Sequence, residues 1–304
     1  MTSVNKPQLI FHLGAHKTAT THFQDTLSLM KDELASYGVT YHSRGEIRGK
    51  LRRIISSPFT SFAFKHAPSS IKNRICQRMF IPPDVEQVFV SDENIIGSCV
   101  DELSIHPYRE LETRTEFIQS LLKSYSVKIL FSVRNFKRVF PGAYTTALRF
   151  DPEAAIKAKT SLSEVLNDGK IPRWTDVIAR VRVALPGADV CVWSQEKYKC
   201  NPADTIRNVL DIPDLVVPSV DDPKETITPN KLAVNLAESR TQKGDINKQT
   251  WLAECDAIFH EHCVGDETER YTFLNNRQNQ LLKDSYELDL IELRQQCPAM
   301  KDFL

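Results

Sequence analysis

The sequence predicts an α/β fold in which a mainly parallel central sheet lies between two layers of helices, with a helical C-terminal part. Short apolar segments typical of buried strands alternate along the chain with longer segments of helical periodicity. These strands end abruptly in polar residues, as strands of a parallel sheet do. The chain has 304 residues, 41% of them hydrophobic, so it can bury a full core. We expect a single domain over residues 1–304.

The first unit of this fold is a strand, a helix and a second strand. Residues 8–14, QLIFHLG, form an apolar run that ends in glycine, and helical spacing of apolar residues begins near Thr20. Gly38 stops this helix, and residues 39–43 return to an extended pattern. A strand followed by a loop and a helix is therefore expected at the start of the chain.

The same alternation continues to the end of the sheet. Further strands are expected at residues 88–90, 127–133 and 189–193, and helices at 109–125, 139–150 and 174–185. From about residue 231 the pattern is helical throughout. Repeated strand and helix segments of these lengths favour parallel pairing with helices on both faces.

Charge and cysteine content exclude several classes of protein. Lys plus Arg and Asp plus Glu are each 39, so no global field favours nucleic acid or a membrane surface. The N-terminal apolar run is too short for a signal segment or a spanning helix, so we expect a cytoplasmic protein. Seven cysteines without a CxxC pair favour reduced thiols. The histidines and cysteines of residues 255–263 face different sides of one helix, so no metal site is expected.

One local basic segment stands out against this balance. Residues 44–78 hold nine Lys or Arg and one acidic residue, Glu46. A solvated helix face explains such a run, and a groove for an anionic acceptor such as an acidic glycan is the functional alternative.

The loop between the first strand and helix reads GAHKTATT and is a candidate phosphate site. Its amides and the helix N-terminus can surround an anion, Lys17 adds a positive charge, and three threonine hydroxyls can donate. It is not a GxxxxGK[ST] loop, because Phe11 and His16 stand where that motif needs glycine. The candidate binding residues are Gly14, Ala15, His16, Lys17, Thr18, Ala19, Thr20 and Thr21.

This loop resembles the 5′-phosphosulfate loop of sulfotransferases that use 3′-phosphoadenosine 5′-phosphosulfate (PAPS). It departs at Ala19, where the family usually has glycine. The segment SVRNFKRVFPGAYTTALRF resembles the family pattern RN(F/Y)xxFxxSxY, with Gly142 at the serine position. The resemblance implies that Arg134 binds the 3′-phosphate, and the backbone N–H of Gly142, or a hydroxyl of Thr145 or Thr146, would replace the missing serine.

A third segment, VFVSDENIIG, resembles the SxEN segment of bacterial and polysaccharide-type sulfotransferases. It implies that Glu93 is the base that takes the acceptor proton. Asp92 and Glu93 can also be structural, and His16 and His42 are rival bases.

The resemblance implies a P-loop nucleotide-hydrolase-like fold, PAPS as co-substrate, no metal, and a hydroxyl or amine acceptor on a small molecule or glycan. We expect acceptor-side insertions at residues 44–80 and 151–173, and the oligomeric state is open. One alternative is a small-molecule kinase that uses Asp92 and Glu93 for Mg²⁺ and as base. The other is a nucleotide-binding pseudoenzyme, motivated by Ala19 and Gly142.

Overall fold

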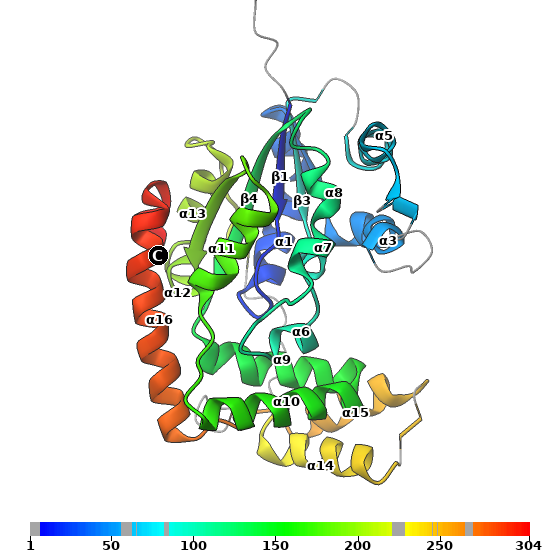
Figure 1. Cartoon of the computed structure of the whole chain (residues 1–304), viewed down its shortest axis with the longest axis vertical. Helices are drawn as coiled ribbons and strands as arrows, with labels where there is room; N and C mark the ends of the chain where they lie inside the picture. Colours follow the sequence, from blue (N-terminus) through cyan, green and yellow to red (C-terminus); the bar gives the residue numbers. More distant parts are fainter. Residues whose placement is uncertain are drawn as a thin grey trace, which may run out of the picture.

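The centre of the protein is a five-stranded sheet with the order β2-β3-β1-β4-β5 (Figure 1). A computed structural model describes residues 7–55, 63–64, 66–81, 85–220, 229–244, 246–247, 249–264 and 270–304. All four neighbouring strand pairs in this sheet are parallel. The strands are β1 (Gln8–His12), β2 (Val39–His42), β3 (Gln87–Ser91), β4 (Ser126–Val133) and β5 (Asp189–Ser194). The predicted parallel α/β sheet is confirmed.

Helices account for most of the remaining chain. Before β4 these are α1 (Thr20–Leu29), α2 (Lys31–Ser36), α3 (Arg44–Ile55), α5 (Ser69–Phe80), η1 (Glu93–Ile95), α6 (Cys99–Glu102), α7 (Leu111–Arg114) and α8 (Glu116–Gln119). After β4 come α9 (Phe136–Phe150), α10 (Pro152–Asn167), α11 (Trp174–Ala184), α12 (Gln195–Cys200), α13 (Pro202–Leu210), α14 (Lys231–Gln242), α15 (Trp251–Glu261), α16 (Asn276–Gln296) and η3 (Pro298–Phe303).

Alternate side chains of β1 pack on opposite helical layers. The ring of Phe11 meets Phe117 of α8 edge-on, with centroids 5.9 Å apart. The next residue, His12, lies 4.6 Å from the ring of Phe23 in α1. Because successive strand residues point to opposite faces, α8 and α1 cover different sides of the sheet. The predicted three-layer arrangement is confirmed.

The helix predicted over residues 109–125 is wrong as one continuous element. It forms the short helices α7 and α8, separated at Thr115. The Thr115 hydroxyl donates to the carbonyl oxygen of Leu111 at 2.8 Å, a local bond that competes with regular helix geometry. The helix after the first loop is likewise divided at Met30, which ends α1 and precedes α2. Apolar periodicity therefore predicted longer helices than the chain forms at both places.

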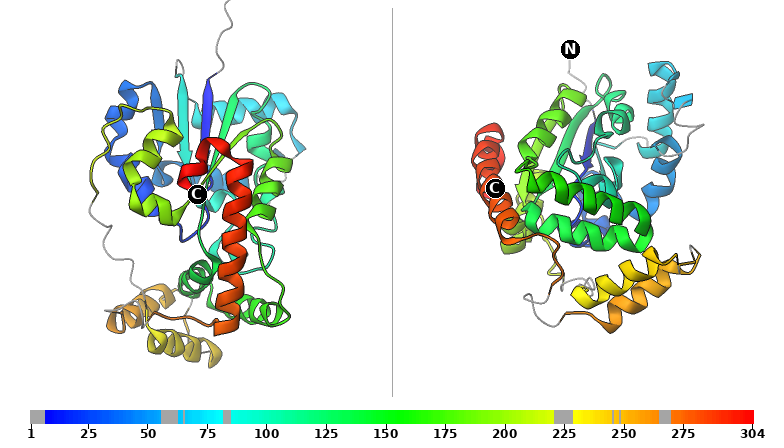
Figure 2. Two further views of the ribbon diagram at one scale, coloured as in Figure 1. Left: turned by 90° about the vertical axis from the view of Figure 1, so that its left-hand side faces the viewer. Right: turned by 60° about the horizontal axis from the view of Figure 1, so that its bottom comes forward.

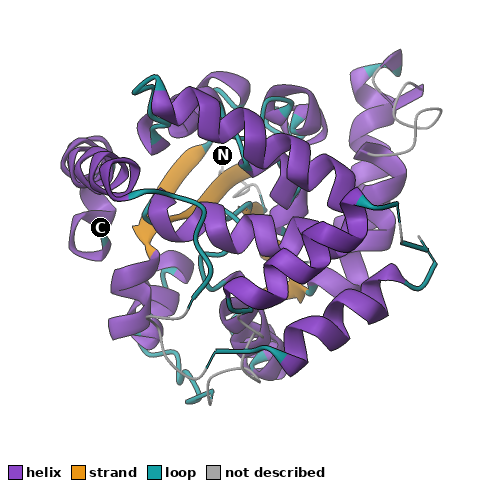
Figure 3. Cartoon of the chain, turned by 90° about the horizontal axis from the view of Figure 1, so that it is seen from below, coloured by secondary structure: helices purple, strands orange, loops and turns teal. Residues whose placement is uncertain are grey.

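The sequence predicted that the C-terminal part is helical throughout, and this prediction is wrong. Isolated antiparallel bridges join Pro229 to Cys263 and Asn230 to Arg270. These bridges close α14 and α15 into one unit, which lies beside α9 and α10 (Figures 1 and 2). Seen from below, helices spread across the end of the sheet to which the strands point (Figure 3).

The strand order places the loops after β1 and β4 side by side. The chain leaves β1 toward β2 and leaves β4 toward β5, in opposite directions across the sheet. Ligands of open α/β sheets bind where neighbouring strands diverge in this way. The edge that carries the ends of β1 and β4 is therefore the expected position of the site.

The two segments predicted as insertions are mainly helical where the structure describes them. Residues 44–80 contain α3 and α5, although 56–62 and 65 lie outside the described residues. Residues 151–173 contain α10, which packs along α9.

Candidate active site

The loop after β1 continues along β4 before it turns into α1. The amide of Leu13 donates to the Leu130 carbonyl at 3.0 Å, and that of Ala15 to the Ser132 carbonyl at 3.1 Å. Gly14 has φ of +39°, and a Cβ there would lie 2.9 Å from both His12 Nε2 and Thr20 Cγ2. Only glycine fits this point, where the loop crosses the sheet edge.

Two non-glycine residues of the loop adopt left-handed backbone conformations. Lys17 has φ of 64°, and Ala19 has φ of 63° and ψ of 27°. Residues of this kind curve the chain so that successive N–H groups converge on one point. Ala19 is the N-cap of α1 and provides no side-chain acceptor, so the first-turn amides of this ten-residue helix have neither a side-chain cap nor an intrahelical partner. These amides form a site suited to a phosphate.

Ala19 adopts the left-handed backbone conformation, which glycine would adopt at a lower cost in free energy. Left-handed geometry costs an L-residue about 1–2 kcal/mol, partly offset by the smaller unfolded-state entropy of alanine. We expect Ala19→Gly to raise the free energy of unfolding by up to about 1 kcal/mol. Urea unfolding measures the change.

Ala158→Gly, inside α10, is the matched control for this substitution. It should lower stability by about 1 kcal/mol, because glycine is a poor helix former. Equal destabilisation by both variants would mean that Ala19 is not strained.

Several polar groups of the loop are directed into the protein. The Thr18 hydroxyl donates to the Ala15 carbonyl at 2.6 Å and lies 2.5 Å from Ser132 Oγ. The amide of His16 donates to the Tyr108 hydroxyl at 3.1 Å. The Thr18 hydroxyl and the His16 amide, which were predicted to bind phosphate, therefore already have partners within the protein. The first turn of α1, which begins at Thr20, follows them directly.

The Lys17 side chain packs against α9. A Cβ added to Gly142 would lie 3.2 Å from Lys17 Cε and 3.3 Å from Lys17 Cγ. Burial is the main cause that lowers the pKa of Lys17, and the charge of Arg134 lowers it further. Because an interior helical amide bonds four residues back, the N–H of Gly142 is used within α9. What Gly142 contributes is space for Lys17.

Arg134, at the end of β4, contacts this loop directly. Its Nη1 donates to the Lys17 carbonyl at 2.8 Å. Its Nε is buried and has no hydrogen-bond partner among the residues that the structure describes. Such an unsatisfied charged donor is costly unless a ligand accepts from it.

Two arginines that the sequence analysis missed lie close enough to act on Arg134. Burial lowers the pKa of Arg134 most, and the charges of Arg138 and Arg270 lower it further. Arg138 lies in the first turn of α9, only four residues after Arg134, so its nearness in the sequence was a detectable signal. Arg270 lies far along the chain and is positioned by an antiparallel bridge to Asn230. No sequence signal predicts this bridge.

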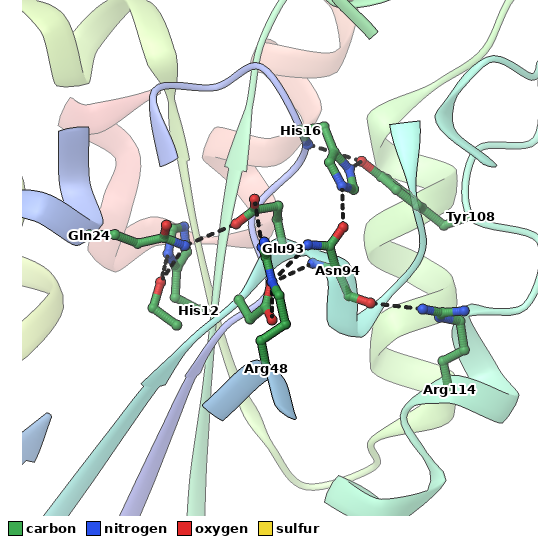
Figure 4. A network of polar contacts seen from close by, with 10 residues as sticks. His12, His16, Gln24, Arg48, Glu93, Asn94, Tyr108 and Arg114 are labelled. Carbon is green, nitrogen blue, oxygen red and sulfur yellow. Dashed lines mark hydrogen bonds and ion pairs between the residues drawn. The ribbon is translucent and has the colours of Figure 1, made fainter. Parts of the chain in front are cut away.

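The two acidic residues after β3, Asp92 and Glu93, have different environments; Figure 4 shows Glu93 with Gln24 and Arg48. Asp92 is 2% exposed, accepts from Arg48 Nη2 at 2.9 Å, and caps η1 by accepting from the amide of Asn94 at 3.1 Å. Glu93 is 12% exposed; its Oε2 accepts from Gln24 Nε2 at 2.9 Å, and its Oε1 lies 3.5 Å from Arg48. Asp92 is therefore structural, and Glu93 is the carboxylate with a less committed oxygen.

His16 and His42, the two alternatives to Glu93 as the base, both have hydrogen-bond partners within the protein. The Nε2 of His42 lies 2.7 Å from the Phe80 carbonyl, to which it donates, and burial lowers the pKa of this histidine. His16 is 5% exposed and contacts Tyr108 and Asn94 through its two ring nitrogens.

Within the described part of the chain, no three His, Cys, Asp or Glu side chains are grouped as metal ligands. No helix in that part is long and apolar enough to cross a membrane.

No family model matches this chain, and no curated protein matches it. A crystal structure of a sulfotransferase from Alicyclobacillus acidocaldarius is similar to it, with 13% sequence identity and a TM-score of 0.42. The alignment covers 84% of this chain and 97% of that one. The function is therefore inferred from the site itself.

Proposed function

We propose that this protein is a sulfotransferase that transfers a sulfuryl group from PAPS to a hydroxyl or amine acceptor. The observation that carries the proposal is the junction of two anion-binding groups, in which Arg134 donates to the Lys17 carbonyl at 2.8 Å. The loop at Lys17 suits one phosphate, and Arg134, whose Nε has no hydrogen-bond partner among the described residues, suits a second. PAPS carries its 5′- and 3′-phosphates on one ribose, so one molecule can occupy both groups.

The chemistry needs little from the protein beyond position and charge. In an in-line displacement, the acceptor oxygen or nitrogen bonds to sulfur as the bond from sulfur to the 5′-phosphate oxygen breaks. The departing oxygen gains negative charge, which Lys17 and the first-turn amides of α1 would stabilise. Glu93 would take the acceptor proton, because it is partly exposed at the same edge of the sheet.

The kinase alternative is disfavoured by the position of Asp92. Both its oxygens accept from Arg48, at 2.9 and 3.2 Å, and one also caps η1. A carboxylate committed in this way has little capacity left for Mg²⁺.

The acceptor proposed for this site is anionic. Arg48 of α3 reaches Asp92 and Glu93, so the basic segment 44–78 extends to the proposed base. A sulfated or carboxylated glycan would be attracted by such a segment.

The test is nucleotide-dependent thermal stability in the presence of EDTA. Adenosine 3′,5′-bisphosphate at about 100 times its Kd should stabilise the wild type by about 2.7 kcal/mol, and adenosine 5′-monophosphate should do so less. We expect Arg134→Ala to weaken bisphosphate binding about 100-fold and to change monophosphate binding little, because one charged hydrogen-bond partner is lost.

Arg182→Ala is the control. Arg182 lies near the C-terminal end of α11, where its Nη1 donates to the side chain of Gln296. It should bind both nucleotides as the wild type does. If the wild type binds neither nucleotide, or if ATP with Mg²⁺ stabilises it better, the proposed function is wrong.

A further inference from the structure

A buried chain of polar groups runs beneath the phosphate loop. Glu102 and Tyr108 are 0% exposed, and their Oε1 and hydroxyl oxygen are 2.7 Å apart. The same hydroxyl lies 3.0 Å from His16 Nδ1, and His16 Nε2 lies 3.3 Å from Asn94 Oδ1 (Figure 4). Asn94 directly follows Glu93, so this chain connects the loop to the segment that carries the proposed base.

The surroundings hold Tyr108 in an unfavourable backbone conformation. Its φ is 58°, a region that costs a bulky residue about 1–3 kcal/mol. Arg180 Nη2 donates to the Tyr108 carbonyl at 2.7 Å. A Cβ on Gly97 would lie 2.8 Å from the Tyr108 ring, so glycine makes room for it. Residues on several elements therefore fix the position of this one hydroxyl.

The hydrogen-bond donors in the chain can be assigned by elimination. Asn94 Nδ2 donates to Asp92 Oδ1 at 3.1 Å, so Asn94 Oδ1 faces His16 and needs a donor. His16 must therefore carry hydrogen on Nε2. The Tyr108 hydroxyl has one hydrogen, and both His16 Nδ1 and Glu102 Oε1 are within its reach. Whichever of the two does not receive that hydrogen must itself be protonated.

Two arrangements satisfy this requirement. In one, Glu102 is a carboxylate and His16 is an imidazolium, which places both charges in the interior. In the other, Glu102 is a neutral acid that donates to Tyr108, and Tyr108 donates to a neutral His16. Glu102 Oε2 has no hydrogen-bond partner among the described residues, so a carboxylate there would be poorly solvated.

The charges around Glu102 and His16 do not reverse the preference for the arrangement in which both side chains are neutral. Burial is the largest effect, raising the pKa of Glu102 well above its usual value and lowering that of His16. Lys17 opposes the rise at Glu102, whereas Glu93 reinforces it. Glu93 and Asp92 favour a charged His16, whereas Lys17 disfavours it.

We propose that Glu102 is a neutral carboxylic acid that acts through Tyr108 to hold His16 as the Nε2–H tautomer, which aligns the phosphate loop with the Glu93 segment. All three are positioning residues. His16 then has no free lone pair, so it is not the base, and Glu93 keeps that role. The catalytic consequence rests on the proposed sulfotransfer, but the protonation state does not.

The first test is nitrogen NMR of histidine in the wild-type protein, with the His16 signals assigned from their loss in His16→Gln. We expect a neutral ring with hydrogen on Nε2 throughout pH 6–8. An imidazolium, or hydrogen on Nδ1 alone, would overturn the proposal. This measurement needs no substrate, so it decides the protonation state even if the proposed function fails.

The second test compares Glu102→Gln, Glu102→Ala and Tyr108→Phe, each with bisphosphate binding measured beside turnover. An amide can donate to Tyr108 as a neutral acid does, so Glu102→Gln should restore most of the activity that Glu102→Ala loses. Tyr108→Phe should lower kcat about 10- to 100-fold, because the loop loses its alignment. If Glu102→Gln is as damaging as Glu102→Ala while it remains folded and binds nucleotide, a neutral Glu102 is excluded.

Discussion

Lys17→Ala is expected to reduce the rate of the proposed sulfuryl transfer by about 10³-fold, the scale of losing one main transition-state donor. The Lys17 side chain packs over Gly142 of α9, so its position is set before substrate binds. Its burial makes the charge more effective on a developing phosphate oxygen than the same charge in water. The substitution removes this charge and leaves the backbone of the loop in place.

The measurement is single-turnover transfer from PAPS, together with circular dichroism to verify the fold. Lys170→Ala, in the exposed loop between α10 and α11, is the matched control and should keep the wild-type rate. A folded Lys17→Ala variant that turns over within a few-fold of wild type would remove Lys17 from the mechanism.

Asp289→Ala is expected to lower the free energy of unfolding by about 3 kcal/mol or more, because it leaves several buried donors unsatisfied. Asp289 on α16 is 0% exposed and accepts from the amide of Trp174 at 2.8 Å and the hydroxyl of Thr175 at 3.0 Å. It also pairs with Arg173 at 2.7 Å. These contacts fasten the start of α11 to the C-terminal helix.

The effect should extend to the site. Trp174 Nε1 donates to the Arg134 carbonyl at 2.7 Å, and its indole stacks on Phe136 with centroids 4.3 Å apart. Loss of Asp289 therefore loosens the support of Arg134, and bisphosphate affinity should fall together with stability.

Glu292→Ala is the control for Asp289→Ala, because Glu292 pairs with the same arginine but is 47% exposed. An exposed ion pair is worth about 0–1 kcal/mol, so this variant should stay close to wild type in denaturant unfolding. Equal losses for the two variants would assign the stability to Arg173 pairing rather than to the buried hydrogen bonds.

The fold class could be predicted because its signal is local. Apolar strands such as β1 and β4 are buried on both faces, so they appear as short continuous hydrophobic runs that end in polar residues. Helix boundaries were predicted less well, as at Thr115, because one hydroxyl that bonds its own backbone leaves no trace in hydrophobic periodicity.

The sequence by itself determined the parallel α/β architecture and the candidate loop around Lys17, since both depend on residues adjacent in the chain. Only the tertiary structure decided which polar groups of that loop face inward, and that Arg270 acts on Arg134. The tertiary structure also distinguished the structural role of Asp92 from the free capacity of Glu93. It did so because both oxygens of Asp92 accept from Arg48, which lies 44 residues earlier in the chain. These outcomes depend on burial and on partners distant in sequence, which no local pattern encodes.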